Sequence, residues 1–324
     1  MKWFISHDSA LQFWRYYQLG DARVTRYSCV RRVSQKLPAA KLPDAGSLRA
    51  VELWSLDKPL HILVGSKAGR KGAGFIKSHI LTTQLPAGSF LKAKDGPYVS
   101  SPELCFVQMA GKLTLPELIA LGYELCGSYR LAANESTGQG FTLASPLTTV
   151  AKLQAFANAA TGLKGRKQAM RAIKYVLADS RSPMETILAM LLCLPYRLGG
   201  YGLPAPQLNT RITGSAEAKR TTHRSHFVCD LYWADYQVDV EYDSRDYHLS
   251  EEQVNDNAKR RNTLAAMGVE VITVTRRQIV SNSELRRVAE ALAVLLDKRL
   301  RTPEQNFNAA HIELRRQLLP RVRG

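Results

Sequence analysis

Two strand patterns, separated by only a few residues, constrain the C-terminal half of this chain more than any other feature of the sequence. His226–Trp233 and Tyr236–Tyr242 are rich in β-branched and aromatic residues, and their close spacing suits a hairpin. The pattern then predicts a helix at Ser250–Met267, a strand at Val269–Thr275 and a helix at Asn282–Leu300. Antiparallel and crossover connections are combined in this order, so we predict a mixed α/β unit.

The length of 324 residues favours more than one domain. Helix starts are indicated where Ser101 and Ser182, as capping residues, precede Pro and Glu, and a further helix is predicted to begin at Leu115, which also precedes Pro and Glu. The patterns predict four segments in chain order: an α+β domain with a basic loop at 1–145, a basic helical connector at 146–180, the α/β unit at 181–300, and a basic helical tail at 301–324.

The charge balance is strongly basic. Lys and Arg number 45 against 28 Asp and Glu, which gives a formal net charge of +17. Such a charge attracts nucleic acid phosphates or an anionic membrane surface, and charge alone does not choose between them. Two acid-free stretches carry candidate phosphate-binding residues, although a solvated surface would also explain them: Lys67, Arg70 and Lys71 in a loop, and Lys164, Arg166, Lys167, Arg171 and Lys174 on predicted helices.

Cysteine usage and hydropathy indicate a cellular compartment. The five cysteines are scattered and form no C-x-x-C pair, which favours buried thiols in a reducing environment. Charged and polar residues interrupt the N-terminal sequence, unlike in a secretory signal, and no apolar run approaches the ~20 residues that span a bilayer. We therefore expect a cytoplasmic protein with no membrane partner.

Acidic residues recur within the two strand patterns. Alternation places Asp239, Glu241 and Asp243 on one face of the second strand, and a hairpin could bring Asp230 of the first strand within reach of Glu241. Neighbouring carboxylates repel one another, and a divalent cation such as Mg²⁺ would offset that repulsion. The alternative is that both acids face solvent at the edges of the sheet.

Glu185 is a further candidate acid with a simple structural explanation. It stands at the third position of a helix that begins with Ser182 and Pro183, where a capping box accounts for a glutamate without any chemistry.

Four segments, together and in this order, resemble endonuclease-like domains related to very-short-patch-repair endonucleases, which belong to the PD-(D/E)XK restriction-endonuclease-like superfamily. The resemblance covers roughly 182–279, and the segments are SPMETILAMLLCLP, LPAPQLN, CDLYWADYQVDVEYDSRDYH and DNAKRRNTLAAMGVEVITVT. It implies a mixed sheet flanked by helices. The region before it resembles, more faintly, the N-terminal part of such proteins and of abortive-infection antitoxins.

The resemblance also implies roles for individual residues. Asp230, Glu241 and Glu185 match the acids that hold Mg²⁺ or Mn²⁺, while Arg260 and its neighbour Arg261 fall where basic residues contact nucleic acid. The lysine of the superfamily's name is absent, because Asp243 occupies its place, and Ser244 stands where the family usually has Gly. His248 or Lys259 would then orient the attacking water or protonate the leaving oxygen, although a structural role for His248 is an equal alternative.

These features together predict a metal-dependent endonuclease that hydrolyses phosphodiester bonds in DNA, with RNA not excluded as a substrate. The alternative is a DNA-binding regulator, or an antitoxin-like protein, in which the nuclease fold no longer cuts. Departures at Asp243 and Ser244 favour that alternative.

Overall fold

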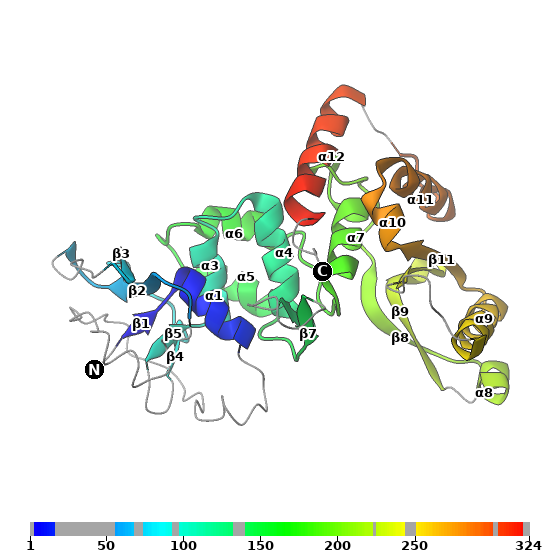
Figure 1. The fold of residues 1–324 in the computed structure, drawn as a ribbon, viewed down its shortest axis with the longest axis horizontal. Helices are drawn as coiled ribbons and strands as arrows, with labels where there is room; N and C mark the ends of the chain where they lie inside the picture. Colours follow the sequence, from blue (N-terminus) through cyan, green and yellow to red (C-terminus); the bar gives the residue numbers. More distant parts are fainter. Residues whose placement is uncertain are drawn as a thin grey trace. The chain divides into compact units, whose positions relative to one another are not determined.

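The computed structural model divides the chain into two compact units, unit 1 (Met1–Val176) and unit 2 (Leu177–Arg323), shown in Figure 1. Both units combine helices with a sheet, which confirms the α/β class expected from the sequence. The structure describes residues 3–16, 56–67, 74–92, 97–131, 140–222, 225–243, 251–300 and 304–319.

Unit 1 contains a five-stranded sheet in the order β3-β2-β1-β5-β4. β1 runs parallel to β5 and antiparallel to β2, while β2 and β3 are parallel. β6 and β7 form a separate hairpin. The strands are β1 (Phe4–Ile5), β2 (Leu60–Val64), β3 (Ile76–Ile80), β4 (Phe90–Lys92), β5 (Tyr98–Ser100), β6 (Tyr129–Leu131) and β7 (Phe141–Leu143).

Two helices of unit 1, α3 and α4, begin where the sequence predicts. Ser101 caps α3, and Thr114 caps α4 through a complete capping box with Glu117. The acid-free stretch folds into two helices, α5 and α6, which contact each other and pack on the helices before them. That stretch therefore lies within unit 1 as far as Val176. The helices are α1 (His7–Tyr16), α3 (Pro102–Met109), α4 (Leu115–Cys126), α5 (Val150–Ala159) and α6 (Arg166–Ile173).

Unit 2 contains a four-stranded sheet in the order β11-β10-β9-β8. β8, β9 and β10 form an antiparallel succession, and β11 is parallel to β10 after the crossover through α9. The elements are α7 (Pro183–Cys193), η4 (Tyr196–Leu198), β8 (Gln207–Thr213), α8 (Ala216–Thr222), β9 (His226–Trp233), η5 (Ala234–Tyr236), β10 (Val238–Asp243), α9 (Glu251–Ala266), β11 (Glu270–Thr275), α10 (Arg276–Val280), α11 (Asn282–Leu295) and α12 (Glu304–Leu318).

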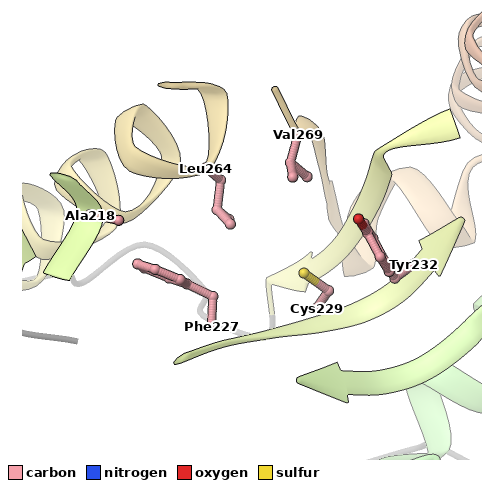
Figure 2. Close-up of a cluster of buried hydrophobic side chains, with 6 residues drawn as sticks. All are labelled: Ala218, Phe227, Cys229, Tyr232, Leu264 and Val269. Carbon is pink, nitrogen blue, oxygen red and sulfur yellow. The ribbon is translucent and has the colours of Figure 1, made fainter. Parts of the chain in front are cut away.

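A hydrophobic cluster fixes α9 against this sheet. Leu264 of α9 packs with Phe227 and Cys229 of β9, and Val269 and Ala218 extend the same cluster (Figure 2). Burial of these side chains supplies the main stabilisation of the contact, because apolar area removed from water contributes roughly 25 cal/mol per Å². The cluster places one face of α9 beside the central strands, where the acidic residues lie.

The C-terminal helix α12 belongs to unit 2, where it contacts η4 and α7. His311 of α12 bonds through Nδ1 to the carbonyl oxygen of Gly199 at 2.6 Å. Among the helices that the structure describes, none has the length and apolar character needed to cross a bilayer.

Candidate active site

The predicted hairpin is present and sits at the centre of the sheet of unit 2. β9 and β10 are joined by η5 and pair antiparallel with Val238 opposite Trp233, Asp239 opposite Tyr232 and Val240 opposite Leu231. Both strands have neighbours on their outer sides, so the carboxylates do not stand at sheet edges. Asp230 and Glu241 are half-buried there, and burying an ionised carboxylate costs energy unless it is paired.

Asp230 is the most perturbed carboxylate that the sequence singled out. Its Oδ2 accepts a hydrogen bond of 3.0 Å from the backbone N–H of Tyr242, which ties the side chain to the neighbouring strand. Burial, together with the nearby carboxylates of Glu185 and Glu241, raises the pKa of Asp230 to about 7, against the lowering effects of the Tyr242 hydrogen bond and of Arg260. No described residue donates a hydrogen bond to Oδ1 of Asp230, so this oxygen remains available to a ligand.

Glu185 reaches toward Asp230 from the first turn of α7. The Ser182 hydroxyl caps the backbone N–H of Glu185, as the sequence predicts, but the predicted capping box is not closed, because the Glu185 carboxylate bonds to residues other than the N-cap. Its Oε2 accepts hydrogen bonds from the N–H of Arg181 at 2.9 Å and from Nδ2 of Asn209 at 2.7 Å. Only 7% of Glu185 is exposed, so these bonds orient a largely dehydrated carboxylate.

Glu241 is held by a cation from the facing helix. Arg260 of α9 forms an ion pair with Oε1 of Glu241 and also donates to the carbonyl oxygen of Val228. The side chain of Arg260 is 21% exposed and that of Glu241 is 16% exposed. Arg260, which the sequence predicts to contact nucleic acid, therefore neutralises the charge of Glu241, a predicted metal ligand. Its neighbours Lys259 and Arg261 are exposed.

Asp239 is a buried acid whose role the sequence did not predict. It is fully buried on β10, and neither of its carboxylate oxygens accepts a hydrogen bond within the described part of the chain. Burial, with a further contribution from Glu241, raises its pKa well above the ordinary range. An acidic cluster is thus formed by Asp239, Glu241, Asp230 and Glu185. Among the ion pairs of the described residues, the one that involves this cluster joins Glu241 to Arg260.

Oxygen ligands suit Mg²⁺ and Mn²⁺, which take carboxylates together with water. Asp230 and Glu185 fit such an ion, since each offers an oxygen that accepts no hydrogen bond from the described residues. Glu241 is shared with Arg260. The three acids do not bring a ligand atom each within 4.8 Å of one another; among the described residues only His7, His61 and His79 do.

The predicted phosphate-binding residues lie in several places. On unit 1, Arg166 donates from Nε to the carbonyl oxygen of Ala157 at 2.7 Å and from its guanidinium to that of Asn158 at 3.3 Å, so it ties α6 to α5. Exposed side chains of this group are Lys67, Lys164, Lys167, Arg171 and Lys174. Three predicted residues, His248, Arg70 and Lys71, lie outside the described residues, as does Ser244.

Comparison with protein-family models, with curated proteins and with solved structures finds no match to this chain. The resemblance to restriction-endonuclease-like domains therefore stays a prediction, and function has to be argued from the site.

The sequence did not indicate the roles of Asn209 and of the three histidines. Asn209 orients Glu185 from 24 residues away, and no local pattern indicates such a pairing. The three histidines come from β2, β3 and the start of α1, and only the pairing of these elements brings them together. Asp239 was placed correctly on the face of Glu241, but the alternation that placed it gave no sign of its complete burial.

Proposed function

We propose that unit 2 is a metal-dependent endonuclease that hydrolyses phosphodiester bonds in DNA. The observation that carries the proposal is the raised pKa of Asp230, a carboxylate on a central strand with Glu185 and Glu241 close by. Groups whose pKa is displaced by burial and by like charges gather at functional sites. A divalent cation relieves both effects at once, because it supplies charge and takes carboxylate oxygens as ligands.

The fold supports the same proposal. A helix with an acid in its first turn, a hairpin with acids on both strands, and a crossover helix leading to a parallel strand follow one another as α7, β9, β10, α9 and β11. This mixed sheet flanked by helices agrees with the arrangement that the resemblance implies. The net charge of +17 favours a polyanionic substrate.

Asp230 and Glu185 would hold Mg²⁺ or Mn²⁺, with Glu241 as the third acid. When bound, the metal lowers the pKa of a water ligand and offsets charge on the phosphate. Asn209 and the N–H of Arg181 keep Glu185 in place, and the N–H of Tyr242 keeps Asp230 in place. Arg260, which pairs with Glu241, would donate to a phosphate oxygen there, and Lys259, exposed on the same helix, would contact the backbone of the nucleic acid.

A nicking assay on supercoiled plasmid tests the proposal. We expect cleavage with Mg²⁺ or Mn²⁺, none with chelator, and a loss on the order of 10²-fold or more in Asp230→Asn and in Glu241→Gln, as for other groups that stabilise charge in a transition state. Asp235→Asn is the matched control, because Asp235 is exposed in the same hairpin. Equal rates in the parent and both site variants would refute the assignment.

A second candidate function is a DNA-binding regulator whose nuclease fold does not cut. The ion pair between Arg260 and Glu241 favours it, because this pair already compensates an expected metal ligand. Here duplex binding persists in chelator and survives Asp230→Asn. Binding that needs the divalent ion would contradict this alternative.

A further inference from the structure

Three histidines line a cavity in unit 1. His7 begins α1, His61 lies on β2 and His79 lies on β3. Each offers a nitrogen, and these three nitrogens all lie within 4.8 Å of one another. The cavity that they line has a volume of about 490 Å³.

The fold of unit 1 holds these side chains together. β2 and β3 are parallel with His61 opposite Lys77 and Leu63 opposite His79, so His61 and His79 lie on the same face of adjacent strands, offset by two residues. The rings of His7 and His79 stack with centroids 3.7 Å apart and planes at 17°. Gln108 of α3 accepts a 3.0 Å hydrogen bond from the backbone N–H of His7, whose φ of 49° is in the left-handed region. Backbone strain of this kind gathers at functional sites.

One nitrogen on each of two rings already has a polar neighbour. Nδ1 of His61 lies 3.1 Å from Oδ2 of Asp8, at ion-pair distance but without the geometry of a hydrogen bond, and Nδ1 of His7 lies 2.9 Å from the Ser6 hydroxyl. Nε2 of both rings is left for a ligand. A carboxylate on the far nitrogen of a histidine is the usual support of a metal-bound imidazole, because it fixes the ring and raises its basicity.

We propose that His7, His61 and His79 bind one Zn²⁺ ion, with Asp8 supporting His61 and with a coordination position open to the cavity. Three protein ligands and an open position are typical of zinc sites that act on a bound molecule, and imidazole is a preferred zinc ligand. Zn–N bonds of about 2.0–2.1 Å around one tetrahedral ion place ligand nitrogens roughly 3.3 Å apart, which is compatible with the 4.8 Å limit. The stacked rings of His7 and His79 have to turn on binding so that their lone pairs converge on the ion.

The walls of the cavity indicate the class of molecule that takes the open position. Lys77 and Lys164 line it with exposed ammonium groups, and Lys112 lines it while paired with Asp8. A small anion such as a phosphate or a carboxylate can then bind the metal and the lysines together.

Metal binding by the full-length chain tests the site directly. Protein treated with chelator is titrated with Co²⁺, whose visible d–d absorption reports nitrogen ligands, and then with Zn²⁺, followed by desalting and measurement of retained zinc. We expect one equivalent of zinc in the parent. His61→Ala and the more conservative His79→Gln each lower the affinity by at least about 10²-fold, and Asp8→Asn lowers it by about 10-fold to 10²-fold.

Two controls separate this site from other histidines and from the proposed nuclease site. His226→Ala, at an exposed histidine of β9, and Asp230→Asn both retain one equivalent. Absence of the Co²⁺ spectrum and of retained zinc in the parent overturns the proposal, whether or not the variants fold. So does equal retention in a folded His61→Ala protein. Inorganic phosphate that binds the chelator-treated parent, with no zinc uptake, would identify an anion pocket without metal.

Discussion

At the scale of single residues, the acidic cluster of unit 2 lowers the stability of the folded state when its buried carboxyl groups are ionised. Asp230 and Asp239 have raised pKa values, chiefly because of burial, and Arg260 compensates Glu241 directly. A group whose pKa is raised on folding favours the native state only while it is protonated. Asp230 therefore reduces stability progressively as pH rises from its ordinary pKa of 3.8 toward about 7, and by a constant amount above that.

The substitution Asp230→Asn removes this effect and keeps an acceptor for the N–H of Tyr242. Each pKa unit corresponds to about 1.4 kcal/mol, and remaining solvent contact reduces the total, so we expect a gain on the order of 2 kcal/mol at pH 8 and none near pH 4. Urea unfolding across this pH range measures it. Asp235→Asn should change little at any pH, and a pH-independent difference for Asp230→Asn would contradict the electrostatic explanation.

At the scale of elements, the approach of α12 to η4 depends on one glycine. Gly199 has a φ of 88°, and a Cβ there would lie 2.3 Å from the carbonyl oxygen of Ala310. At the same contact between η4 and α12, Nδ1 of His311 bonds to the carbonyl oxygen of Gly199. Close backbone approach of this kind excludes any side chain.

Gly199→Ala should therefore destabilise unit 2 by about 3 kcal/mol or more, since both the left-handed backbone and the close contact oppose the methyl group. Gly268→Ala is the matched control, with a φ of 80° and no atom within 4 Å of the added Cβ. For Gly268→Ala, the left-handed backbone conformation alone predicts a loss of about 1–2 kcal/mol in the free energy of unfolding. Thermal unfolding measures both, and equal losses would show that the contact with α12 does not limit stability.

At the scale of the whole molecule, the positive charge is concentrated where acids are absent from the sequence. On α6 and directly after it, Lys167, Arg171 and Lys174 are exposed and form no ion pair with the described acids. Such a surface binds phosphates by releasing counterions, so its contribution shows in the salt dependence of affinity.

Replacing these three residues by glutamine should weaken duplex binding and reduce the slope of log K against log salt by about 2–3. The control is a triple glutamine variant at Arg220, Arg286 and Arg316, which have the same charge but each pair with a glutamate on their own helix. Binding isotherms at several salt concentrations measure the slopes. Identical slopes for the two triple variants would remove α6 from the interface.

The sequence by itself determined several elements of the C-terminal half and their order, although it did not predict β8, α8 or α10. Period-2 patterns and caps locate β9, β10, β11 and α7 to within a few residues, because these signals are local. It also placed Asp230 and Glu241 on paired strands, since a short connection leaves little choice but a hairpin. Only the tertiary structure decided what surrounds those acids: Arg260 on Glu241, Asn209 on Glu185, complete burial of Asp239, and three histidines around one cavity. Each of these depends on packing between residues distant in the chain, and burial, which sets the pKa of an acid or a histidine, is a property of that packing.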